Sequence, residues 1–427
     1  MDRIADHPLR YQLANELHAR PFPSLSAPCH ALFLAIKAPK DAANRDRGID
    51  RAHLVALLDR YGAAHPQPDA THYFGDLGRY RLKWEQHTEF VTYTLFGDGV
   101  AGRPFDPAMF DVFPAGWLSQ APGLRLSSAL IRIEEMPGTE AEIDTRLGEW
   151  FLPESLTVSY VADSSAIIAG DFHIDSAGHL RFAVFVRPKM GPRRIGRIVQ
   201  RLTEVEVYKS MSLLALPRAR ALSGQLAAQD RQVLRVVRDI KESARPESDV
   251  LDELLALSAE LEDMVAQHSF RFSATRAYSA IVAQRVAAMR EARFEGRQTF
   301  SEFMMRRFDP AMRTVRAVAG QLEALAERTK RAGDLLRTRV EVERSAQNQQ
   351  VLASMDRRAD LQLRLQKTVE GLSVVAISYY ALNLLTYLFA PAADIAGVEK
   401  HILTAIATPL VVLVVWAVVR RIRKAHE

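Results

Sequence analysis

The feature that most constrains this chain is a pair of long uncharged segments near its C-terminus. Leu372–Ala390 and Ile402–Val419 contain no Asp, Glu, Lys or Arg. A helix needs about 20 apolar residues to cross the roughly 30 Å hydrocarbon core of a bilayer, and both segments approach that length. Only Pro391–His401 separates them. The sequence therefore predicts two antiparallel membrane spans, residues 372–390 and 402–419; the alternative is a pair of core helices in a soluble protein.

Basic residues flank the outer ends of both segments. They are Arg357, Arg358, Arg364, Lys367, Arg420, Arg421, Arg423 and Lys424. The link between the segments has one Lys, offset by Asp394 and Glu399. Because cytoplasmic flanks of membrane helices are enriched in Lys and Arg, we expect both termini in the cytoplasm and the lipid bilayer of a bacterial inner (plasma) membrane as the partner.

The rest of the chain supports a cytoplasmic location. Cys29 is the only cysteine, which excludes a disulfide framework and favours a reducing compartment. The first 20 residues have no apolar run, so we expect no secretory signal. The net charge of +5 is concentrated near the apolar segments, which membrane topology explains better than nucleic-acid binding.

Residues 1–190 predict a cytoplasmic α/β domain. Alternating apolar residues indicate strands, and helical spacing occurs between them. The strands are expected at His30–Ala38, Arg79–Glu85, Glu89–Phe96, Leu124–Glu134, Ser155–Val161, Ala166–Ile174 and Leu180–Arg187. The helices are expected at Pro8–Leu17, Ile49–Tyr61 and Glu140–Phe151. This alternation is typical of a layered α/β domain.

Residues 191–370 predict a long-helix bundle or stalk without strands. The helical spacing of Ile195, Ile198, Leu202, Val205 and Tyr208 opens it. Further helices are expected at Arg218–Ala244 and at Ser248–Gln267, followed by a very long helical region from about Phe270 to Lys367 in which Asp309-Pro310 is a kink or a helix restart.

A heptad-like seam follows Pro310. It comprises Val315, Val318, Leu322, Leu325, Thr329, Ala332, Leu336 and Val340, and it resumes at Val351, Met355, Ala359 and Leu363. A lone helix would leave this seam in water, so the seam packs on an earlier helix of the chain or on other copies of the chain. Both alternatives stay open at this stage.

Three clusters are candidate ligand sites. Glu16, His18 and Arg20 would combine an anion clamp with a proton-exchanging pair, or simply end a helix before Pro21. Arg193, Arg194 and Arg197 open a helix and would hold an anion or a lipid headgroup, or pair with Glu204 or Glu206. Asp171, His173 and Asp175 would share one face of a strand, with His179 nearby, and so form a divalent-cation site or the wet face of a hairpin.

Polar residues inside the first apolar segment are candidate pore-facing groups. Ser378, Tyr379 and Asn383 interrupt the apolar run. Polar residues in a span face protein or water rather than lipid, so they line a pathway or pack between helices. The sequence has no HExxH, CxxC, GxSxG or GxGxxG motif, and we expect no enzymatic activity and no cofactor.

Three blocks of the sequence resemble one family. They are Glu16-Leu17-His18-Ala19-Arg20-Pro21, Met190–Arg220 and Leu365–Ser373. The chain is similar to an uncharacterised bacterial family of predicted membrane-anchored proteins, and the resemblance implies no activity. The layout also resembles the CorA-type magnesium channels, which are homopentamers with a Gly-Met-Asn filter at the end of the first span. This chain has Ala390-Pro391-Ala392 at that place.

The patterns together predict a membrane-anchored, homo-oligomeric scaffold or sensor with its domains in the cytoplasm. The alternative is a divergent CorA-like cation channel or transporter without the filter. A membrane-held enzyme acting near Glu16, His18 and Arg20 is a third hypothesis.

Overall fold

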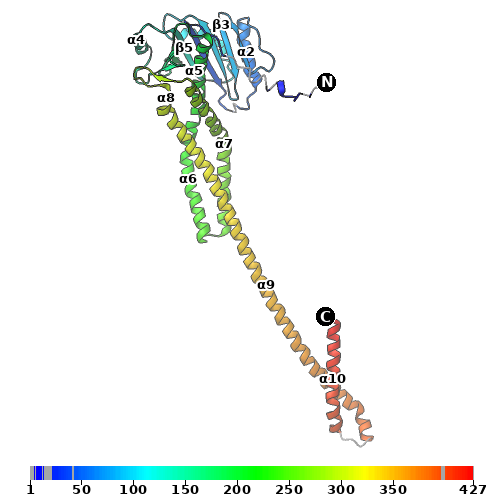
Figure 1. Cartoon of the computed structure of the whole chain (residues 1–427). Coiled ribbons are helices and arrows are strands. Elements are labelled where there is room, and N and C mark those ends of the chain that lie inside the picture. Colours follow the sequence, from blue (N-terminus) through cyan, green and yellow to red (C-terminus); the bar gives the residue numbers. More distant parts are fainter. Residues whose placement is uncertain are drawn as a thin grey trace. The chain divides into compact units, whose positions relative to one another are not determined.

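The computed structural model describes residues 4, 6–11, 13, 22–40, 43–395 and 400–426. The chain divides into two compact units, Met1–Ala332 and Gly333–Glu427. The first unit contains an α/β sheet domain followed by long helices, and the second is helical (Figure 1). The predicted order of an α/β domain, a long helical region and a C-terminal helix is confirmed.

Nine strands within the described residues form one sheet, in the order β2-β3-β4-β1-β5-β8-β7-β6-β9. They are β1 (Cys29–Lys37), β2 (His72–Leu77), β3 (Tyr80–Gln86), β4 (Phe90–Asp98), β5 (Leu124–Glu135), β6 (Thr157–Val161), β7 (Ala166–Gly170), β8 (Leu180–Val186) and β9 (Ala292–Arg293). All neighbours are antiparallel except β5 and β8, which are parallel. The sheet is therefore mixed.

The central strand β1 is apolar on both faces because both faces are covered. Leu32, Leu34 and Ile36 point into the larger core, which also contains residues of α2 (Arg47–Arg60), the 3₁₀ helix η1 (Pro107–Val112), α3 (Ala115–Leu118) and α4 (Glu140–Trp150). The other face is covered by α5 (Pro192–Leu213), which buries Ile195 and the other apolar residues spaced along it.

Three long helices complete the first unit. These are α6 (Ala215–Glu242), α7 (Glu247–Ala288) and the first part of α9 (Asp309–Ile395). Helix α7 packs on α5 and α6, and Arg328 of α9 donates to Asp230 of α6 at 2.5 Å. The predicted seam from Val315 to Ala332 is buried within this single chain. For that stretch, the intrachain alternative holds.

Two predictions for the helical region are wrong. No strand was expected after Gly191, yet β9 pairs with the edge strand β6. The helix expected from Phe270 onward is interrupted between Ala288 and Phe300. Gly296 there has a φ of +74°, and Thr299 forms a capping box with Glu302 that starts α8 (Phe300–Phe303). A π-helical turn, Met304–Phe308, then leads into α9.

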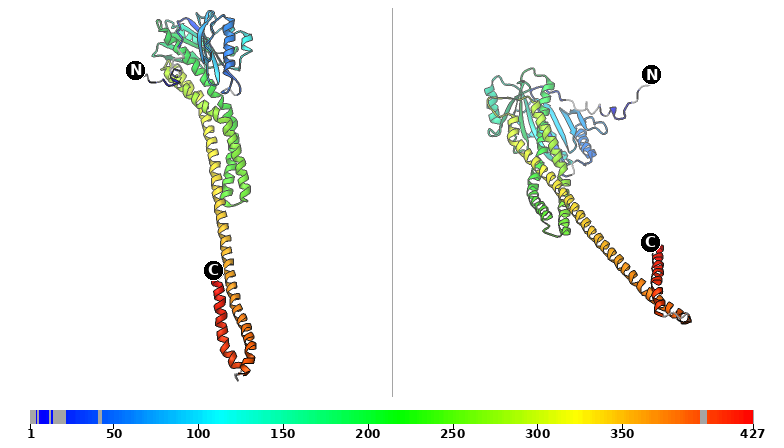
Figure 2. Two further views of the ribbon diagram at one scale, coloured as in Figure 1. Left: turned by 90° about the vertical axis from the view of Figure 1, so that its right-hand side faces the viewer. Right: turned by 60° about the horizontal axis from the view of Figure 1, so that its bottom comes forward.

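The second unit consists of the rest of α9 and α10 (Lys400–His426). Helix α10 follows the end of α9 and runs back in the opposite direction (Figure 2). Residues 372–390 lie in α9, and residues 402–419 lie in α10 with Pro409 inside the helix. Both segments are therefore helical, as expected.

Candidate functional site

A cavity of about 700 Å³ opens beside the sheet face that η1 and α3 cover. Leu34 and Ile36 of β1 line it from the sheet, and Phe113 and Leu118 line it from the region of α3. Its polar lining residues are Asp111, Arg125 and His179. An apolar cavity of a few hundred Å³ with a few convergent polar groups is the usual form of a small-molecule site.

Three of the lining rings, His179, Phe110 and Phe113, belong to a row of ring contacts that continues into the core through Trp117 and His53. His179 stacks on Phe110 with ring centroids 3.9 Å apart, and Phe110 contacts Phe113 at 5.6 Å. Phe113 stacks on Trp117 at 5.5 Å, and Trp117 stacks on His53 at 4.0 Å. Packed aromatic rings have little rotational freedom, so these lining rings are fixed before any ligand arrives.

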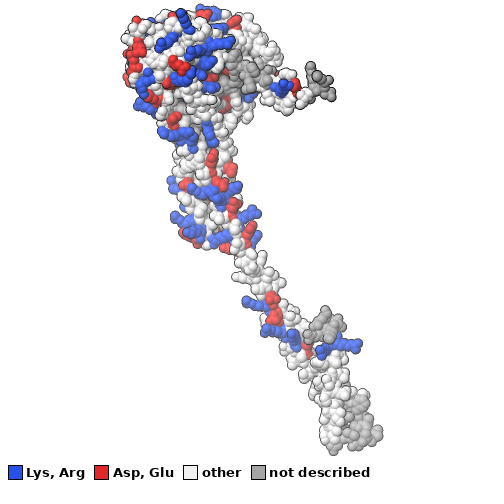
Figure 3. All heavy atoms as spheres, viewed as in Figure 1, with Lys and Arg blue, Asp and Glu red and all other residues white. Residues whose placement is uncertain are grey.

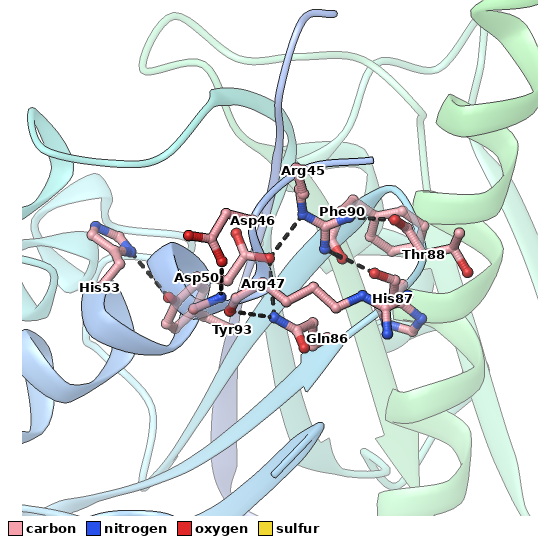
Figure 4. A network of polar contacts seen from close by, with 11 residues as sticks. Arg45, Asp46, Arg47, Asp50, His53, Gln86, His87, Thr88, Phe90 and Tyr93 are labelled. Carbon is pink, nitrogen blue, oxygen red and sulfur yellow. Dashed lines mark hydrogen bonds and ion pairs between the residues drawn. The ribbon is translucent and has the colours of Figure 1, made fainter. Parts of the chain in front are cut away.

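His53, at the end of the row away from the cavity, is hydrogen-bonded to strand β4 and to α3. Its Nε2 lies 3.1 Å from the carbonyl oxygen of Trp117, and its Nδ1 lies 3.0 Å from the Tyr93 hydroxyl (Figure 4). Since a carbonyl only accepts, Nε2 carries the proton and Nδ1 accepts from Tyr93. Burial lowers the pKa of His53, so the ring is neutral at pH 7. The Trp117 indole N–H in turn donates to the His53 carbonyl at 2.8 Å, which fixes α3.

At the near end, His179 presents an unused nitrogen. Its Nδ1 lies 2.9 Å from Ser128 Oγ, which also lies 3.1 Å from the Gly178 carbonyl oxygen. The Ser128 hydroxyl has one proton, so both contacts are hydrogen bonds only if it donates to Gly178 and His179 Nδ1–H donates to it. Nε2 is then a bare acceptor, and it has no partner among the residues that the structure describes. Burial, reinforced by Arg125, lowers the pKa of His179.

Arg125 brings a positive charge to the same cavity. Its guanidinium lies against Gly178, where a Cβ atom would come within 2.4 Å of it. No hydrogen bond or ion pair joins Arg125 to any other described residue. A β-bulge sets its direction: β1 and β5 shift register between Ala35 and Ile36, so that Ile36 pairs with Arg125. Without the bulge, Leu126 would face the cavity in its place.

A second, more open cavity of about 1020 Å³ lies along η1 and the strand ends of β1 and β4. Asp111 lines both cavities. Here the Arg79 guanidinium donates to the Tyr80 hydroxyl at 2.8 Å, and His30 Nδ1 lies 2.8 Å from the Gly99 carbonyl oxygen. Because its cation is already engaged, this cavity is the weaker candidate.

The turn between β3 and β4 is a polar junction (Figure 4). On one side, Arg45 donates to Asp50 at 2.8 Å and to the carbonyl oxygens of His87 at 2.8 Å and Phe90 at 3.1 Å. Gln86 also donates to Asp50, at 3.1 Å. These bonds lock the start of α2 to the turn.

On its other side, the same turn binds α7. Glu89 is 1% exposed and pairs with Arg271, which is 7% exposed. The Tyr278 hydroxyl donates to Glu89 at 3.1 Å, and burial together with Glu89 raises the pKa of Tyr278. The turn therefore connects the sheet to the helices by a buried ion pair.

The three candidate metal residues have separate surroundings. Strand β7 ends at Gly170, and Phe172 has a φ of +51°, so Asp171 and Asp175 do not share a strand face. Asp171 pairs with Arg181 at 2.8 Å, and Asp175 accepts from the backbone N–H of His179 at 2.9 Å. His173 is exposed. Among the described residues, no three or more His, Cys, Asp or Glu are grouped to hold a metal ion.

The basic cluster is at the start of α5, as its sequence indicates. Arg193 is exposed, Arg194 lies 3.9 Å from Asp163, and Arg197 lies over the ring of Phe22. None of the three pairs with the expected carboxylates: Glu204 binds Arg285, and Glu206 binds Lys209. Glu16, His18 and Arg20 lie outside the described residues.

The candidate pore residues have unequal exposure. Ser378 is 6% exposed, and its hydroxyl has no partner among the described residues. Tyr379 is 64% exposed, and Asn383, one turn further along, is half-buried.

Sequence reasoning singled out His179 but missed Arg125, Asp111 and the aromatic row. Arg125 has the pattern of an ordinary polar position in an alternating strand, because the bulge that redirects it has no local signal.

A protein-family model described as "Protein of unknown function (DUF3422)" matches residues 5–426. The chain belongs to this family. The description of the family names no activity, and no curated protein matches the sequence.

Proposed function

We propose that this family member is a membrane-anchored protein whose residues 372–390 and 402–419 cross a bacterial inner membrane. The α/β domain faces the cytoplasm and acts as a scaffold or sensor rather than as an enzyme. We further propose that several copies assemble through the helices.

Exposure is the observation that carries the anchoring proposal. Two helices among the described residues are long and apolar enough to cross a membrane, and only 6% and 11% of their most apolar windows are buried. A core helix of a soluble protein is mostly buried. Leu384 and Leu388 are 70% and 71% exposed, and Leu410 and Leu413 are 65% and 63% exposed. Exposed apolar area costs about 25 cal/mol per Å² in water, and lipid removes this cost.

The charge distribution supports the same reading. Figure 3 shows Lys, Arg, Asp and Glu spread over the α/β domain and the helices beside it, whereas the end of α9 is mostly free of them. The basic residues next to the two segments suit the cytoplasmic side.

The alternative is a divergent CorA-like cation channel or transporter. The half-buried Asn383 in the first apolar segment favours it, because polar groups in a span face protein or a water-filled pathway rather than lipid. Tyr379 and Asn383 would then line the pathway.

Thiol labelling tests the anchoring and its orientation. Cys29 is 2% exposed, and burial raises its pKa to about 12, so the native chain gives no labelling background. We expect a Val398→Cys variant to react with a membrane-impermeant maleimide on intact spheroplasts. The matched Ser345→Cys variant, at an exposed position, should react only after lysis. Labelling of both variants only after lysis, or release of the protein by alkaline washing, would contradict the proposal.

A further inference from the structure

The cavity beside η1 and α3 combines three properties that a structural void lacks. It contains the exposed Arg125, whose guanidinium makes no ion pair with the described residues, the imidazole of His179 with an acceptor nitrogen open to the cavity, and apolar side chains of β1 and α3. The His179 residue is 6% exposed, and its Nε2, which has no hydrogen-bond partner in the described part of the chain, is accessible from the cavity that the ring lines. These groups point to a molecule that completes them.

We propose that this cavity binds a small carboxylic acid with an apolar body and a hydrogen-bond donor next to its carboxylate, as in apolar hydroxy acids and amino acids. This inference goes beyond membrane anchoring and does not depend on it. Each part of the ligand class follows from one group in the cavity.

The carboxylate is assigned to Arg125. A guanidinium presents a planar fork of N–H donors that matches a carboxylate in a two-bond arrangement. Arg125 is exposed and its guanidinium stays charged at physiological pH, so it attracts an anion that enters the open side of the cavity. Its place against Gly178, the residue before His179, brings the cation and the imidazole to the same end of the cavity.

The donor is assigned to His179. With Nδ1–H committed to Ser128, Nε2 can only accept, and a carboxylate alone would face it with another acceptor. A hydroxyl or ammonium group beside the carboxylate removes this conflict. Asp111, on the rim at the end of η1, would further favour an ammonium group.

The apolar body is assigned to the side chains of β1 and α3. Leu34, Ile36, Phe113 and Leu118 leave no polar partner for the far end of a ligand. The volume of about 700 Å³ lies in the ordinary range for small-molecule sites and accommodates an aromatic or branched side chain. The lining rings of His179, Phe110 and Phe113 contact one another and are packed on Trp117, so binding needs little rearrangement of this side of the cavity.

Calorimetric titration of the full chain in detergent tests the proposal with four small molecules that share a phenyl ring on a short carbon chain. These are phenyllactate, L-phenylalanine, 3-phenylpropionate and phenethylamine. We expect saturable binding of phenyllactate or phenylalanine, binding of 3-phenylpropionate weakened about fivefold, and no binding of phenethylamine. Preference for phenylalanine that is lost in Asp111→Asn identifies an amino acid, and preference for phenyllactate identifies a hydroxy acid; both support the proposal.

Variants separate the cavity from non-specific binding. Arg125→Gln should weaken binding of the carboxylates at least tenfold, because it removes a charge-assisted contact. Arg103→Gln, which removes an exposed Arg outside the cavity lining, is the matched control and should leave binding unchanged. Ala121→Phe should fill the cavity and abolish binding while the melting temperature stays near that of the parent.

Absence of saturable binding by both phenyllactate and phenylalanine, or equal binding by Arg125→Gln and the parent chain, would overturn the proposal. Neither result would bear on the membrane anchor, which thiol labelling tests separately.

Discussion

At the scale of single residues, the close approach of two backbone segments decides which side chain position 196 tolerates. Gly196 lies in α5 where the helix meets the segment that contains Pro23. A Cβ atom at position 196 would come within 1.7 Å of the Pro23 carbonyl oxygen. The next contact along this segment, from Leu25 N–H to the Pro192 carbonyl oxygen at 3.1 Å, depends on the same close fit. Glycine is therefore needed here for space rather than for backbone freedom.

We predict that Gly196→Ala lowers the free energy of unfolding by about 1–3 kcal/mol, the usual cost of overpacking. Gly224→Ala is the matched control, because Gly224 is an exposed helical residue with open space at its Cβ position. Alanine there should raise stability by about 0.5–1 kcal/mol. Chemical denaturation of the full chain in detergent measures both changes. Two shifts of the same sign would argue against the close contact at Gly196.

At the scale of elements, the turn between β3 and β4 joins the sheet to the helices. Arg45 and Gln86 hold it to the start of α2, whereas Glu89 holds it to Arg271 of α7. A buried ion pair contributes little over two apolar residues, but the loss of one partner leaves an uncompensated charge. The turn is therefore the place where damage to one side chain would loosen the contact between two layers.

We predict that Arg271→Met destabilises the first unit by about 3–5 kcal/mol, because Glu89 then stays buried without its counter-ion. Arg276→Met on the same helix is the control. Arg276 pairs with Glu323 at 4.0 Å, and both side chains are more than half exposed, so its loss should cost about 0–1 kcal/mol. Denaturation midpoints of the two variants give the comparison. If Arg271→Met cost no more than Arg276→Met, the turn would not have the role assigned to it.

At the scale of the whole molecule, burial along α9 changes between the two units. The seam is buried in the first unit, whereas Val351, Met355 and Leu363 in the second unit are 56%, 59% and 57% exposed. Exposed apolar residues at helical spacing outside the proposed spans are typical of a contact between chains. They support the proposed homo-oligomer.

We predict that light scattering of the full chain in detergent gives a protein mass of two or more times the 47.8 kDa of one chain. Val351→Glu combined with Met355→Glu should shift the mass toward the monomer, because two charges on one helical face oppose association. Ser345→Glu with Gln349→Glu places the same charges at exposed polar positions and should leave the mass unchanged. A strictly monomeric parent would contradict assembly, and a pentamer would favour the channel alternative.

The sequence by itself determined the elements and their order. Short apolar runs placed β1, β5 and β8, and a spacing of 3.6 residues placed α2, α4 and α5, since these patterns record how an element is buried. The two uncharged segments could also be recognised as helices from the sequence, because length and the absence of charge are local properties. The predicted resemblance to an uncharacterised family is confirmed.

Only the tertiary structure decided which residues meet. The two-residue strand β9 has no periodicity of its own and exists because the edge of β6 offers it hydrogen bonds. The seam of α9 could not reveal its partner, since α6, α7 and another copy of the chain present similar apolar faces. The cavity depends on a one-residue bulge that turns Arg125 toward His179, more than 50 residues away in the chain. Register and bulges depend on the fit between distant segments, so a local pattern contains no record of them.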